Sequence, residues 1–164
     1  MTDEKIYCLD TCIMIWAIQE NPDPSVADKV IKARTFISNL TKQGYRLLIP
    51  AIVLAELLVG VPVAEQPELL AMFQKKFRII QFDTAAAIKY GVLWNHGQEI
   101  DITSAFSNAE GVRTTIKFDY MIIATAVTNN AMTIVSEDLG MMKASEGIIP
   151  VTNLPEIHDQ PELF

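Results

Sequence analysis

The chain lacks several features that would place it in large classes of protein. Its 164 residues include only two histidines and two cysteines, Cys8 and Cys12. The spacing of these cysteines fits neither a C-x-x-C redox motif nor half of a zinc site, so we expect ordinary buried thiols. No apolar run reaches the roughly 18–20 residues that span a bilayer, and the acidic N-terminus does not resemble a signal peptide. We therefore expect a cytoplasmic protein with no membrane association.

Positive charge is also scarce. Thirteen lysines and arginines stand against twenty acidic residues, which gives a net charge of −7. This is the wrong sign for a protein that binds nucleic acid through its overall field. A polyanionic substrate would have to be held by a local group of basic side chains and by bound metal. Half of the residues are apolar, which argues against disorder and allows a real core in a single domain.

Short apolar runs typical of strands alternate along the chain with helical patterns. This alternation predicts an α/β fold, in which helices flank both faces of a parallel sheet in three layers. We expect one domain over residues 1–152. The predicted strands are Ile6–Leu9, Arg46–Ile49, Phe77–Phe82, Met132–Ser136 and Ile148–Val151, and the predicted helices are Thr11–Gln19, 26–43 with Ser25 as its cap, Ala51–Val59, Pro67–Lys76, Ala85–His96, Asp119–Asn129 and Leu139–Lys143.

Two segments do not fit this alternation. Residues 97–116 are polar and contain Gly97 and Gly111, so we expect a polar insertion that leaves the core. Residues 153–164 contain two prolines and several acids, and we expect a loosely held C-terminal tail.

Four carboxylates stand at the edges of apolar segments, where a charge is costly. Asp10 follows the first predicted strand, and Asp138 follows the fourth. Asp119 opens a predicted helix, and Glu56 interrupts the apolar run 51–59. Because the carboxyl ends of parallel strands lie along one edge of a sheet, we expect these acids to converge. Such a cleft is typical of a site for a hard divalent cation such as Mg2+.

Capping of helices is the alternative explanation for the aspartates. Asp10, Asp119 and Asp138 each precede a predicted helix, and an aspartate there can serve only to accept backbone N–H groups. Asp83 has the same placement and is assigned to capping. Glu56 differs, because it lies within an apolar helix with no basic residue in the adjacent turns. Burying it unpaired would cost several kcal/mol, which favours a metal or cleft role.

Hydroxyl and basic side chains near the acids are further candidates. Thr11 and Ser136 could orient the carboxylates or metal-bound water, although both residue types are also common near helix starts. Arg113 and Lys117, which precede Asp119, are the candidates for contacting a polyanionic substrate. The alternative for both is a solvated charge in a loop.

Four segments together resemble the PIN domain, and within it the VapC-type toxin ribonucleases. They are Leu9–Ile13 (LDTCI), Ala55–Gly60 (AELLVG), Phe118–Ala126 (FDYMIIATA) and Ile134–Asp138 (IVSED). Each motif is weak alone, but four in this order and spacing are fairly specific. The similarity runs from Ile6 to about Leu154.

This resemblance implies a parallel sheet flanked by helices and a cleft of three or four acids that binds Mg2+ or Mn2+. By position, Asp10, Glu56 and Asp119 match the most regular acids of the family, and Asp138 matches the fourth region. Ser136 stands where the family usually has Thr or Ser. Many members continue with an Asp-Phe pair where Met141-Met142 stands here, so Asp138 would carry the fourth role alone.

The expected function is therefore metal-dependent cleavage of RNA, with catalysis and metal binding by the four acids. In the VapC branch the partner is a small antitoxin, which makes this chain a candidate toxin. The apolar residues of 51–61 and 67–77 also predict a homodimer. A PIN-like module that binds nucleic acid or protein without cutting remains the alternative.

Overall fold

The computed structural model describes residues 5–99 and 110–156. The order of its elements is β1 (Ile6–Leu9), α1 (Thr11–Ile18), α2 (Ala27–Lys42), β2 (Arg46–Pro50), α3 (Ala51–Val59), α4 (Gln66–Lys76), β3 (Arg78–Ile80), α5 (Thr84–Glu99), α7 (Glu110–Thr128), β4 (Thr133–Val135), α8 (Leu139–Ala144) and β5 (Val151–Thr152).

The five strands form one parallel sheet in the order β3-β2-β1-β4-β5. From β1 the chain adds β2 and then β3 on one side, and it returns with β4 to the other side of β1. The strand order therefore reverses between β1 and β4, where Leu9 lies in register with Val135. In open parallel sheets the crevice beyond the carboxyl ends of such a pair is the usual place for a ligand.

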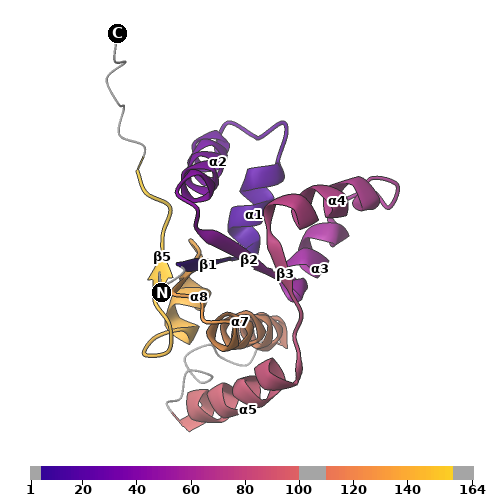
Figure 1. The fold of residues 1–164 in the computed structure, drawn as a ribbon. Coiled ribbons are helices and arrows are strands. Elements are labelled where there is room, and N and C mark those ends of the chain that lie inside the picture. The colour runs from indigo at the N-terminus through magenta and orange to yellow at the C-terminus, as the bar shows by residue number, and fades with distance from the viewer. Residues whose placement is uncertain (1–4, 100–109, 157–164) are drawn as a thin grey trace.

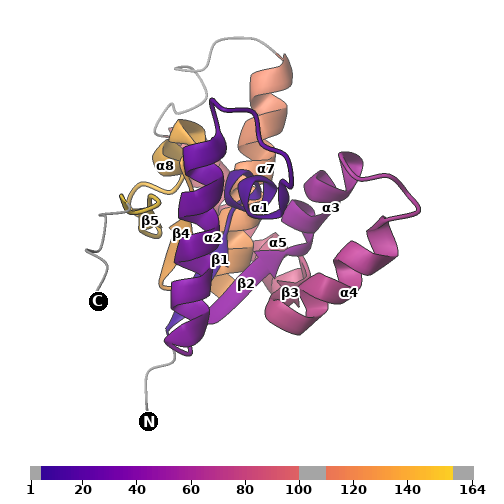
Figure 2. The same cartoon turned by 90° about the horizontal axis from the view of Figure 1, so that it is seen from above.

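Helices cover both faces of the sheet, which confirms the predicted three-layer α/β/α arrangement. In Figure 1, α1 and α2 lie above the sheet, and α7 lies below it with α5 beyond. Figure 2 looks down on the face that α2 covers. Buried side chains from the sheet and from both layers form one apolar cluster, which includes Leu9, Ile13, Ile49, Phe73, Ile123 and Ile134.

Helix α7 begins nine residues earlier than its sequence predicts. It starts at Glu110, and α5 continues to Glu99, so both ends of the predicted polar insertion 97–116 belong to helices. Its middle, 100–109, lies outside the described residues. The early turns of α7 expose polar residues such as Lys117 while Ile116 is buried. The apolar face is narrow over these turns, so their sequence resembles a polar loop.

Two smaller expectations are also wrong. Ser25 does not cap α2, because the N-cap residue is Val26 and the Ser25 amide donates instead to Asp23 Oδ1 at 2.9 Å. The last strand begins at Val151 rather than Ile148. The amides of Ile148 and its neighbour Ile149 donate to the carbonyl of Ser145, which makes this stretch a turn after α8.

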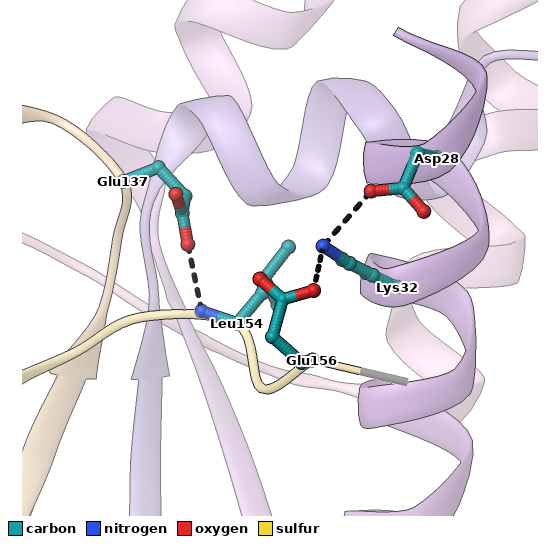
Figure 3. A network of polar contacts seen from close by, with 5 residues as sticks. All are labelled: Asp28, Lys32, Glu137, Leu154 and Glu156. Carbon is teal, nitrogen blue, oxygen red and sulfur yellow. Dashed lines mark hydrogen bonds and ion pairs between the residues drawn. The ribbon is translucent and has the colours of Figure 1, made fainter. Parts of the chain in front are cut away.

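Residues 153–156 lie against the domain (Figure 3). Leu154 is buried, and its amide donates to Glu137 Oε1 at 2.8 Å. The Lys32 ammonium lies 2.6 Å from a Glu156 carboxylate oxygen and 2.8 Å from one of Asp28. The start of the predicted tail is thus bound on both sides, whereas 157–164 lies outside the described residues.

Candidate active site at the carboxyl ends of β1 and β4

Asp10 is held at the border between β1 and β4. Its amide donates to the Val135 carbonyl at 3.1 Å. Its Oδ1 accepts from the Thr11 amide at 2.7 Å and so caps α1, while its Oδ2 accepts from the Ser136 hydroxyl at 2.6 Å. Only 6% of the residue is exposed. Burial raises the pKa of Asp10, the hydrogen bonds from Ser136 and Thr11 oppose that rise, and the Asp138 charge adds to it.

Asp138 follows β4 and caps α8. Its Oδ1 accepts from the Met141 amide at 2.9 Å, and its own amide donates to the Ser136 hydroxyl oxygen at 3.0 Å. The capping alternative thus describes part of what both Asp10 and Asp138 do. Capping is not their whole effect, because the charge of Asp138 also raises the pKa of Asp10 and of Asp119.

Asp119 lies well inside α7, so the capping alternative is wrong for this residue. It is 8% exposed, and its Oδ2 is buried with no hydrogen-bond partner among the described residues. Burial is the main cause that raises the pKa of Asp119 to about 7. The charges of Asp10, Asp138 and Glu56 raise it further, in that order. The field of all three other acids therefore reaches Asp119.

Glu56 lies on α3 and is half-buried. The Thr11 hydroxyl donates to its Oε2, so this carboxylate has a hydrogen-bond partner although no basic residue lies in the adjacent turns. This bond joins the first turn of α1 to α3. Thr11 therefore orients the carboxylate of Glu56 through its side chain and that of Asp10 through its amide.

Sequence reasoning missed two residues at this site, Cys12 and Gly140. The Cys12 sulfur lies 3.7 Å from both Asp10 Oδ2 and the Ser136 hydroxyl oxygen, so this thiol is part of the site. A Cβ on Gly140 would lie 2.8 Å from Asp138 Oδ1 and 3.4 Å from Asp119 Oδ2. The signal for Gly140 was available, because glycine is a poor helix former and here occupies the first turn of a predicted helix.

The structure does not show either basic candidate beside the acids. Lys117 is exposed on α7, and residues two apart on a helix do not face the same side, so it points away from the direction of Asp119. Arg113 belongs to α7, but its side chain lies outside the described residues.

No ready-made metal cage is present in the described part of the chain. There, no three histidine, cysteine, aspartate or glutamate side chains are grouped so that they could hold an ion. The charges of the other three acids raise the pKa of Asp119, yet the four side chains are not grouped closely enough to hold an ion as they stand.

Comparison with known proteins identifies the family. A family model described as the PIN domain matches residues 7–146, a span that contains all four acids. The chain belongs to the PIN domain family. This confirms the resemblance found in the sequence. No match was found among curated proteins.

Several solved structures share this PIN fold. A chain of VapBC2 from Rickettsia felis, bound to a promoter DNA fragment, is 22% identical with a TM-score of 0.64, and the alignment covers 92% of this chain and 99% of that one. VapBC-1 from nontypeable Haemophilus influenzae gives 16% identity, a TM-score of 0.62 and coverage of 91% and 98%. A toxin–antitoxin complex from Klebsiella pneumoniae gives 20% identity, a TM-score of 0.58, and coverage of 92% of this chain and 99% of that one. None of the described helices is long and apolar enough to cross a membrane.

Proposed function

We propose that this PIN domain is a metal-dependent endoribonuclease that cleaves single-stranded or structured RNA. The observation that carries the proposal is the buried Oδ2 of Asp119, which has no hydrogen-bond partner among the described residues and lies in the field of three other carboxylates. Such an arrangement costs folding free energy unless a cation offsets it. Structural roles such as capping do not account for it.

The donor set fits Mg2+ or Mn2+. Asp10, Glu56, Asp119 and Asp138 offer hard oxygen ligands, and Mg2+ keeps several of its waters, so it does not need oxygens that already meet at one point. We assign the four acids to metal binding, either directly or through water. A bound divalent ion would lower the pKa of a water nucleophile and offset charge on the phosphate.

The hydroxyl groups have a positioning role in this proposal. Ser136 fixes one oxygen of Asp10, and Thr11 fixes one oxygen of Glu56. Both bonds cross between elements, so they hold the carboxylates in place against mutual repulsion before any ion binds. Partners of metal ligands commonly act in this way.

We further propose a small antitoxin as a partner, because the VapBC and toxin–antitoxin structures above share this fold. We also propose a homodimer, which the exposed apolar side chains of Val59 on α3 and Met72 on α4 support. The cytoplasm is the proposed location, where both RNA and such a partner would be met.

The test is cleavage of a mixed RNA pool by purified protein, with Mg2+, with Mn2+ and with EDTA. We expect cleavage with either ion and none with EDTA. Asp119→Asn should abolish it. Asp83→Asn is the matched control, since it removes one charge but keeps a residue that caps a helix equally well, and it should cleave normally.

The other candidate function is a PIN-fold module that binds nucleic acid or protein without cutting. RNA binding without cleavage under any divalent ion would support this alternative. Cleavage that persists in EDTA would contradict the proposed role of the acids.

A further inference from the structure

The edge of the sheet opposite the acids carries a row of basic residues. Lys5 directly precedes β1, Arg46 opens β2 and Arg78 opens β3. Lys76, the last residue of α4, comes two residues before Arg78. Because β3, β2 and β1 are neighbours and parallel, their first residues lie along the same edge. Ile6 is in register with Arg46, so Lys5 faces the other side of the sheet, where its ammonium lies over the Tyr45 ring. We call Arg46, Lys76 and Arg78 the basic edge.

The register and the lining of a depression bring these residues together. Leu48 is in register with Arg78, and alternate residues of a strand share a face, so Arg46 and Arg78 lie on the same face of the sheet. An open depression of about 530 Å³ is lined by Tyr45, Arg46, Leu47, Lys76 and Arg78. All three basic side chains are exposed.

The described side chains that line the depression carry charge of one sign. No carboxylate lines the depression, and Lys76 and Arg78 form no ion pair with another described residue. A lysine at a helix C-terminus has a structural explanation, since it complements the helix dipole. That explanation applies to Lys76 but not to the two arginines, which open strands. In a chain of net charge −7, the depression is therefore lined by a local group of positive charge.

We propose that the basic edge binds the phosphate backbone of single-stranded RNA, away from the site of cleavage. This inference rests on the proposed function, because it gives the substrate of the acid site a second point of contact. The acids repel a phosphodiester, so affinity for RNA has to come from elsewhere on the surface. Guanidinium groups match phosphate oxygens in pairs, and two of them share the depression.

The length of the sheet sets the size of substrate that reaches both sites. The five residues of β2 separate the two edges by at least roughly 16 Å at about 3.3 Å per residue, and an RNA on the surface has to follow a longer path around the sheet. An RNA of several nucleotides can span that distance, whereas a dinucleotide cannot. An acidic protein partner is less favoured, because none of the large exposed apolar side chains lines the depression.

The first experiment measures binding of labelled single-stranded RNA by fluorescence anisotropy in EDTA, over a range of salt. Arg46→Gln/Arg78→Gln should lower the affinity at least tenfold. The slope of log K against log salt should shrink by about 1.4, or roughly 0.7 for each lost phosphate contact. Lys76→Gln/Arg78→Gln is a second variant, which keeps the test valid if the first folds poorly. Lys29→Gln/Lys89→Gln removes the same charge outside the depression and should retain wild-type affinity.

The second experiment measures cleavage. With long RNA, the edge variants should raise KM severalfold and leave kcat unchanged, and they should cleave a dinucleotide at the wild-type rate. If no RNA is cleaved by the wild type while binding still depends on Arg46 and Arg78, the proposed function fails and the basic edge stands. Equal loss of affinity in the control variant, or no RNA binding by the wild type, overturns the inference. The inference is also overturned if the edge variants keep their affinity for RNA but lose binding to an acidic peptide or to duplex DNA.

Discussion

Ser136 donates its hydroxyl proton to Oδ2 of Asp10 at 2.6 Å, across the border where β4 and β1 end side by side. The same hydroxyl oxygen accepts the amide of Asp138 at 3.0 Å. One fully buried side chain thus connects the carboxylate after β1 to the backbone that leads into α8. The relative position of Asp10 and Asp138 depends on this connection.

Ser136→Ala should therefore damage both stability and the site. The change leaves the Asp138 amide without its acceptor and Asp10 without its shortest side-chain hydrogen bond. Loss of a partner by a buried polar group costs about 1–3 kcal/mol, which urea unfolding would measure. Mg2+ affinity should fall as well. Ser145→Ala is the control, because Ser145 is equally buried but donates to the Met142 carbonyl. It should cost about 1 kcal/mol and leave Mg2+ affinity unchanged.

Asp119→Asn should leave the metal-free protein at least as stable as the wild type. Asparagine has nearly the same shape, and it removes a charge that burial and three other acids disfavour. Mg2+ raises the melting temperature of the wild type if it binds only the folded form, and the variant should gain less. Asp83→Ala should do the opposite. It removes the acceptor of the Ala86 amide at the start of α5, at a cost of about 1 kcal/mol, and retains the response to Mg2+.

The stability of the metal-free protein should fall as the pH rises from 5 to 8. The pKa of Asp119 is about 7 in the folded protein and near 4 in an unfolded chain, so the folded state binds more protons between these values. The contribution of Asp119 is fully present below pH 4 and is lost as the pH passes 7. Thermal unfolding across this range should show a smaller decline for Asp119→Asn. Equal declines in the two proteins would contradict the raised pKa.

Gly140→Ala should impair the site although it adds only a methyl group. The new Cβ would lie 2.8 Å from Asp138 Oδ1, so the capping carboxylate or the start of α8 has to move. We expect lower Mg2+ affinity and slower RNA cleavage. Gly91→Ala is the matched control, because a Cβ there meets nothing within 4 Å and lies inside α5. It should stabilise the fold by about 0.5–1 kcal/mol and leave cleavage unchanged.

The sheet and its order of elements could be predicted because short apolar strands leave a clear pattern. Asp10, Ser136 and Asp138 could be placed at one edge for the same reason. The start of α7 could not, since its first turns are polar on all but one narrow face and resemble a loop. That error also made Asp119 look like a helix cap.

Contacts between distant segments of the chain could not be predicted from the sequence either. The hydrogen bond from Thr11 to Glu56 joins residues 45 positions apart, and no local sequence pattern near either residue predicts it. The approach of Gly140 to Asp119 depends on how α8 packs on α7. Local patterns identify which side chains are unusual, but they do not show which of them meet.

The position of β4 in the sheet has a consequence for synthesis of the protein. Strand β1 pairs with β2 early in the chain, but its other neighbour is β4, which follows more than 120 residues later. A nascent chain on the ribosome therefore carries Asp10, Glu56 and Asp119 before it carries Ser136 and Asp138. The border between β1 and β4 closes only after residues 133–135 have left the ribosome. If the domain cleaves RNA as proposed, a nascent chain that still lacks β4 cannot hold the complete site next to its own messenger.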